Sequence, residues 1–168
     1  VLMQALHELR TQIISPMTDE LKTDKEEDAD ELFQQHIEAQ CKRLRILGFT
    51  GTPIIRGNLN AMDKSLLPSL QTVCTEILNN IAKHGKPGAF AFILSVGPDA
   101  VRIFASNLYN AAINSAPENH YGTALIQDFA QQHNGTMTIN SENEEWSLSL
   151  TIPLAHQVKL MFSPTEKL

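Results

Sequence analysis

The sequence has 168 residues, of which 42% are hydrophobic and 19% charged, so one domain can bury an ordinary core without disulfides or metals. Eight acids and two lysines between Thr18 and Leu32 carry the whole net charge of −6. This excludes a basic nucleic-acid surface, and we interpret the acidic run as a solvated helix start or linker. No apolar run reaches the roughly 20 residues that cross a membrane. Cys41 and Cys74 lack metal-ligand spacing, and we expect two reduced, buried thiols.

Helical periodicity dominates the first third of the chain. Residues 1–15 place leucines and isoleucines at helical intervals, and Pro16 ends or kinks that helix. A second helix is predicted to begin near Thr23, where the spacing fits a capping box, and to stop at Gly48. Its apolar stripe is Leu32/Phe33, Ile37, Cys41 and Leu44.

The remainder alternates strands and helices. The patterns predict a short strand at 52–57, a helix from Leu66 to Lys83 closed by Gly85, strands at 89–96 and 101–106, an irregular stretch at 107–121, a helix at 123–133, and a hairpin of "TMTINS" and "EWSLSLTIPL". This order of elements predicts an α+β fold, with helices and an antiparallel or mixed sheet in two layers.

The helix over 66–83 carries an unusual polar stripe. Glu76, Asn80, Lys83 and His84 fall within an arc of about 100° beside the apolar face. An Asn oxygen can complete the octahedral shell of Mg²⁺, a Lys can neutralise phosphate, and a Glu can orient or deprotonate water. An ordinary amphipathic helix with a solvated edge is the alternative that the helical wheel leaves open.

The order of motifs resembles the ATPase superfamily of histidine kinases and gyrases. "TEILNNIAKHG" resembles its N-box, "VRIFASN" its adenine-binding D-box, and "HYGTALIQDFAQQHNGTMTI" its G-box with the following helix and strand. The resemblance covers roughly residues 45–154. It implies a two-layer α/β sandwich of the Bergerat ATP-binding type, preceded by a helical dimerisation and linker segment.

The resemblance also implies roles for the polar stripe. Asn80 would coordinate Mg²⁺, and Glu76 would hold water or the metal shell and assist transfer. Lys83 and His84 would reach phosphate. The cofactors implied are ATP and Mg²⁺.

A second phosphate contact is implied at the G-box. Gly122 stands at the family's second G-box glycine and opens a helix whose amides can meet phosphate. Thr123 would cap that helix or contact the same phosphates, although the residues fit a plain helix N-terminus equally well. The first G-box glycine is replaced by His120.

The D-box departs from the family pattern. Asn107 stands where the family has Asp, and Leu108, Tyr109 and Asn110 replace the glycines that follow. An Asn oxygen can still accept a hydrogen bond from adenine, at a loss of order 1 kcal/mol. We therefore expect weakened ATP binding, with Asn107 as a plain turn residue left as an alternative. Restoring Asp at 107 and Gly at 120 should rescue binding if the site has only decayed.

The N-terminal helices resemble the end of the dimerisation hairpin in sensor kinases that partner NarL-type response regulators. We expect residues 1–22 to be that hairpin end, 23–154 the ATP-binding domain with a linker helix over 23–46, and 155–168 a tail. "HELRT" resembles a phosphoacceptor box, but too few residues separate His7 from the first strand. We therefore expect the phosphoacceptor upstream, outside this piece.

These readings together predict the ATP-binding catalytic domain of a sensor histidine kinase, which transfers the ATP γ-phosphoryl to a histidine of its own dimer. We expect a homodimer through the N-terminal helices, a NarL-type response regulator as partner, and a cytoplasmic location in a membrane-anchored bacterial sensor. One alternative is a degenerate, non-catalytic dimer or partner-docking module of the same fold. An anti-sigma or serine-kinase relative is another.

Overall fold

The structure is a computed structural model that describes residues 29–109 and 121–154. The chain divides into two compact units, 1–33 and 34–168, and the description below concerns the second. The helix predicted over 1–15, the capping box at Thr23, His7, His120 and the tail from 155 lie outside the described residues. The domain boundaries at 22 and 154 therefore stay predictions.

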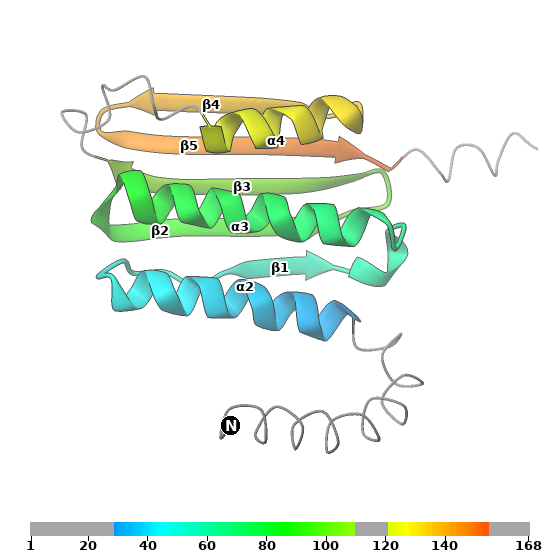
Figure 1. The fold of residues 1–168 in the computed structure, drawn as a ribbon, viewed down its shortest axis with the longest axis horizontal. Coiled ribbons are helices and arrows are strands. Elements are labelled where there is room, and N and C mark those ends of the chain that lie inside the picture. The colour runs from blue at the N-terminus through cyan, green and yellow to red at the C-terminus, as the bar shows by residue number, and fades with distance from the viewer. Residues whose placement is uncertain (1–28, 110–120, 155–168) are drawn as a thin grey trace, which may run out of the picture. The chain divides into compact units, whose positions relative to one another are not determined.

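A mixed five-stranded sheet forms one layer (Figure 1). Its strands run in the order β1-β2-β3-β5-β4. Strand β1 pairs parallel with β2, and every other pair is antiparallel. The bounds are β1 Ile54–Gly57, β2 Gly85–Val96, β3 Ala100–Tyr109, β4 Thr136–Glu142 and β5 Glu145–Pro153.

Helices form the second layer. Their bounds are α2 Ala29–Ile46, α3 Leu66–His84 and α4 Tyr121–Gln132, with a 3-10 turn η1 at Leu59–Ala61. Helix α3 contacts β2 and β3, and α4 contacts β4, β5 and α3. The His36 Nε2 of α2 lies 2.9 Å from the Thr75 Oγ1 of α3. The predicted two-layer α+β sandwich is thus confirmed.

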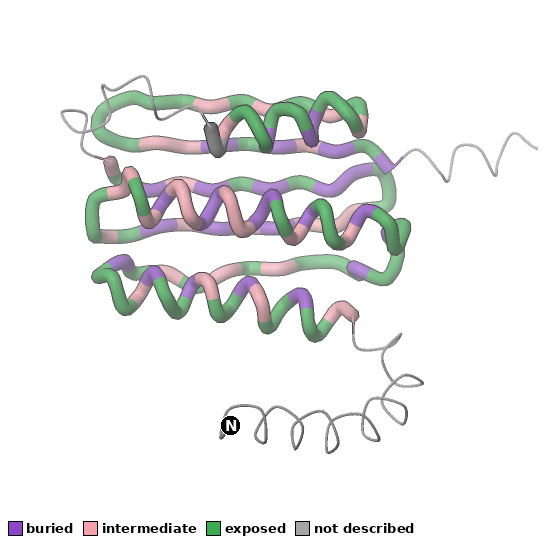
Figure 2. The backbone as a smooth tube through the Cα atoms, viewed as in Figure 1, coloured by how far each residue is buried: buried purple, intermediate pink, exposed green. Residues whose placement is uncertain are grey.

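The core follows from period-2 alternation in the strands and a 3.6-residue period in α3 (Figure 2). In β3, Val101, Ile103 and Ala105 are buried, whereas Arg102 and Phe104 between them are exposed. The buried side chains from the other elements are Phe90, Phe92, Leu94, Leu148, Leu150 and Ile152 of the sheet and Leu70, Val73, Cys74, Ile77, Leu78 and Ile81 of α3. One face of the sheet therefore packs on helices, and the opposite face carries the half-buried and exposed residues that alternate with the core.

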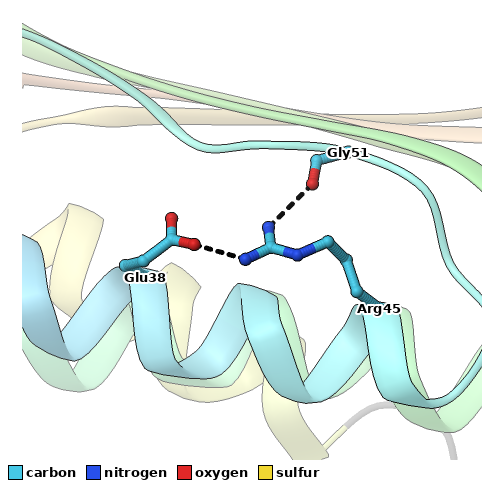
Figure 3. Close-up of polar contacts among 3 residues, drawn as sticks. All are labelled: Glu38, Arg45 and Gly51. Atoms are coloured by element: carbon cyan, nitrogen blue, oxygen red, sulfur yellow. Dashed lines mark hydrogen bonds and ion pairs between the residues drawn. The ribbon is translucent and has the colours of Figure 1, made fainter.

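Helix α2 ends at Ile46, just before Gly48, the predicted stop, whose φ of 97° is the left-handed conformation that glycine adopts at helix ends. A side-chain clamp then holds the loop that follows (Figure 3). The Arg45 guanidinium forms an ion pair with Glu38, which lies about two turns earlier on α2. The Arg45 Nη1 also donates a hydrogen bond to the Gly51 carbonyl over 2.9 Å. This contact fixes the loop that leads into β1.

Two strands are longer than predicted. Residues 85–88 were expected to be a turn after α3, but they begin β2, with a register irregularity between Gly85 and Phe90. Residues 107–109 were expected to be irregular, but they end β3, where Asn107 pairs with Phe90 and Trp146. The predicted hairpin is confirmed.

Candidate functional site

The polar stripe of α3 lies on the flank that faces α4. Thr75 is hydrogen-bonded to His36 of α2, so it marks the side of α3 that faces α2. Asn80 lies about 140° around the helix from Thr75. Figure 1 shows α4 on the side of α3 opposite α2, and α3 and α4 are in contact. Glu76 and Asn80 on this flank are half-buried, and Lys83 near the helix end is exposed. An acid, an amide and a base therefore line the seam between two helices.

Asn80 has an unusual environment within this seam. Its side-chain Nδ2 is buried and, among the described residues, has no hydrogen-bond partner. A buried donor without an acceptor costs about 1–3 kcal/mol, so protein structures rarely keep one without a reason. An oxygen-rich ligand or an ordered water at this place would satisfy the amide.

Asn107 is the buried polar side chain of the described core, with 4% of its surface exposed. It stands on the helix-facing side of β3, in line with Ile103 and Ala105. Its Nδ2 donates to the carbonyl oxygen of Leu108 over 2.8 Å. The carboxamide is thus held in place by the strand that carries it.

Gly85 joins Asn107 to the end of α3. Its amide donates to the Ile81 carbonyl, which closes the last turn of the helix. A Cβ at this position would lie 2.4 Å from Ile81 O, 2.5 Å from Asn107 Nδ2 and 2.9 Å from the Phe49 ring. Only glycine lets the end of α3 approach Asn107 so closely. The sequence indicated this glycine as a helix stop and missed its role as a spacer.

The start of α4 supplies the remaining predicted site residues. Gly122 lies in the first turn of α4, and Thr123 follows it half-buried. The first amides of a helix have no partners within the helix and carry its positive dipole end. The contact between α3 and α4 places this helix beside the one that carries Asn80. His84, at the last position of α3, is half-buried.

Leu108 does not occupy the place of a missing glycine on the inner face. Alternation directs it to the face opposite Asn107, where 42% of it is exposed. A Cβ at Gly88 would lie 3.6 Å from its Cδ1, so it packs near the irregular part of β2. Leu108, which stands in place of a D-box glycine, therefore projects from the sheet on the face away from the helices.

His36 of α2 is half-buried and has a hydrogen-bond partner that the sequence did not indicate. The Thr75 hydroxyl donates its proton to the Gln71 carbonyl over 2.9 Å, so it accepts from His36 Nε2–H. No local pattern could have shown a bond between residues 39 positions apart in the chain. The bond ties α2 to the helix that carries Glu76 and Asn80.

The two cysteines are free and buried, as predicted. Burial, with a smaller contribution from Glu38, raises the pKa of the Cys41 thiol to about 11, and burial raises the pKa of the Cys74 thiol further. Both are therefore protonated at neutral pH and unsuited to nucleophilic chemistry.

Within residues 29–109 and 121–154, no three His, Cys, Asp or Glu side chains gather as a metal centre. Nor does any helix in these ranges have the length and apolar character to cross a membrane.

Comparison with solved structures identifies the fold. The chain is similar to the catalytic domain of histidine kinase ThkA, at 12% identity and a TM-score of 0.55, over 74% of this chain and 93% of that one. It is also similar to the Acinetobacter baumannii histidine kinase AdeS, at 13% identity and a TM-score of 0.55, over 92% and 84% of the two chains. A blue-light-activated histidine kinase of Erythrobacter litoralis matches at 12% identity and a TM-score of 0.53, over 72% of this chain and 41% of that one.

No family model and no curated protein matches the sequence. At these identities the likeness establishes the fold, which is that of histidine kinase catalytic domains.

Proposed function

We propose that the chain is the ATP-binding catalytic domain of a bacterial sensor histidine kinase. It transfers the γ-phosphoryl group of ATP to a histidine of its own dimer, which we place upstream of this piece. The single observation that carries the proposal is the buried side-chain Nδ2 of Asn80, on the flank of α3 that faces α4, which has no hydrogen-bond partner within residues 29–109 and 121–154. The fold shared with histidine kinase catalytic domains supports the same function.

The residues at the seam fit a metal-bound triphosphate. The amide of Asn80 offers an oxygen to Mg²⁺ and a hydrogen-bond donor to phosphate or water. Lys83 is exposed and long enough to act as a point charge on phosphate. The first amides of α4, at Gly122 and Thr123, suit a second phosphate. Mg²⁺, when bound, neutralises charge on the transferring group.

The chain's own residues act chiefly by positioning. Glu76 stands one turn before Asn80 and can orient water or accept a proton at its carboxylate. Asn107 offers an acceptor to the adenine amine from the floor of the sheet. Phosphoryl transfer needs alignment and charge stabilisation more than covalent chemistry by the enzyme, and this arrangement supplies both. We place the dimer contact in the N-terminal helices and the membrane segment of the sensor outside this piece. We also propose that the partner of the kinase is a response regulator of the NarL type.

A fluorescent ATP analogue tests the site. We expect Mg²⁺-dependent binding in the micromolar range, lost in Asn80→Ala. The matched control is Asn79→Ala, which removes the same side chain from the neighbouring half-buried position, about 100° around the helix. A flat titration at millimolar ligand with a folded chain, or equal loss in both variants, would contradict the proposal.

A further inference from the structure

Strand β4 forms one edge of the sheet (Figure 1). Among the strands of the described residues it pairs with β5 alone, so the other side of its backbone meets no strand there. An exposed edge offers unpaired N–H and C=O groups to another chain, and proteins usually blunt such edges. The opposite edge of this sheet is blunted, because β1 has only four residues and carries the exposed Arg56.

Strand β4 lacks these protective features. Its seven residues, TMTINSE, include no proline and no lysine, and the strand's charge is confined to Glu142 at the last position. The register with β5 is continuous from Thr136 to Glu142, so no β-bulge turns the edge away. The edge is therefore regular and able to accept another strand.

The hairpin turn determines which backbone groups of β4 point outward. Asn143 and Glu144, with φ of 53° and 62°, form a two-residue turn of the primed type, closed by hydrogen bonds between Glu142 and Glu145. Hydrogen-bonded pairs alternate along an antiparallel ladder, so every second residue of β4, counted back from Glu142, bonds to β5. The residues between them direct their N–H and C=O groups to the free edge; they are Met137, Ile139 and Ser141.

We propose that β4 pairs with β4 of a second copy of this chain, antiparallel and about a two-fold axis through Ile139. Only this register pairs all seven residues of the strand with each other. It sets Met137 opposite the partner's Ser141, so each outward-facing residue meets another one and their backbone groups can bond. A two-fold axis lets the same residues serve both copies. This interface goes beyond the proposed function and does not depend on nucleotide binding.

The side chains that this register brings together are compatible. Ile139 meets its counterpart on the helix-facing side, in line with the buried Leu148. On the opposite face Thr138 meets the partner's Asn140, and both are exposed and polar. Glu142 meets the partner's Thr136, so no like charges stand opposite each other. A single strand pair is a small interface, and we expect weak association, in the micromolar to millimolar range.

Sedimentation equilibrium of the full 168-residue chain, with charge changes at Thr136, tests the interface. Thr136 is exposed and lies at the other end of β4 from Glu142 of its own copy, so a charge there meets Glu142 only across the interface. Thr136→Glu creates two Glu–Glu pairs and should weaken self-association by about 2- to 30-fold. Thr136→Lys creates two Lys–Glu pairs and should strengthen it by a similar factor.

A second pair of variants removes a backbone donor. Ser141→Pro deletes an amide that points to the free edge and makes no bond to β5, whereas the matched control Ser141→Ala keeps that amide. We expect Ser141→Pro to associate at least about tenfold more weakly than Ser141→Ala, because the proline also blocks close approach of the second strand. Both variants should retain the circular dichroism spectrum of the folded chain.

The other outcomes overturn the interface. A molar mass that does not rise with concentration would show that the edge does not pair with a second copy. Self-association that responds to neither charge change would belong to another surface of the chain. Equal weakening by Thr136→Glu and Thr136→Lys would show that the strand does not pair in this register. All three outcomes leave the proposed function standing.

Discussion

Gly85 is the position where a single methyl group should disturb both the fold and the candidate site. Its φ of −73° is open to any residue, so Gly85→Ala tests space and not backbone strain. The added Cβ meets Ile81 O at 2.4 Å, Asn107 Nδ2 at 2.5 Å and the Phe49 ring at 2.9 Å, all closer than real Cβ contacts allow. Overpacking costs about 1–3 kcal/mol, and three simultaneous clashes justify the upper value. For a chain of this length, about 3 kcal/mol lowers Tm by roughly 6–12 °C.

Thermal unfolding followed by circular dichroism measures this effect. Gly97→Ala is the matched control, because its φ is not positive and its Cβ would meet only Ala100 O at an ordinary 3.5 Å. That change should be neutral or stabilise by about 0.4–1 kcal/mol through the unfolded state. Equal Tm values for the two variants would refute the reasoning, and so would a less stable Gly97→Ala.

Two further predictions concern the hairpin and the thiols. Glu144 has a φ of 62° in the two-residue turn between β4 and β5, a conformation that glycine adopts more readily. Glu144→Gly should therefore raise the free energy of unfolding by about 0.5–1 kcal/mol, as measured by urea titration. A destabilised variant would contradict the turn geometry. Because burial raises the pKa of Cys41 to about 11 and that of Cys74 further, Ellman's reagent at pH 8 should label the folded chain at least about 100-fold more slowly than the urea-unfolded chain, and fast labelling of the folded chain would refute the burial. The unfolded state releases these protons first, so stability should fall as the pH rises above about 9.

The hydrophobic periodicity and turn residues of the sequence predicted those helices and strands whose formation depends on residues close together in the chain. The hairpin follows from two alternating runs with a short polar link, and the structure forms it with positive φ at Asn143 and Glu144. Helix α3 follows from a long apolar period and ends at His84, one residue beyond the predicted bound. The facing of Glu76 and Asn80 toward one flank follows from the same period.

Features that depend on distant partners were not predictable in this way. Asn107 reads as a turn residue because it is polar, yet pairing with Phe90 and Trp146 carries the strand through it, and Leu108 O satisfies its side chain. Pro87 lacks an amide proton for strand pairing, yet it lies within β2, in the part of the strand with irregular register, where a missing ladder bond is tolerated. Tertiary pairing overrides composition at both places.

The parallel pairing of β1 has a consequence for the order in which the domain assembles. Each hairpin, β2 with β3 and β4 with β5, closes over a short turn, whereas β1 reaches β2 only after the chain has passed through η1 and α3. Closing a loop across such a span costs conformational entropy, and the pairing of only four β1 residues with β2 offsets that cost. We therefore expect this edge of the sheet to associate last and to exchange its amide protons first, while the hairpins remain protected.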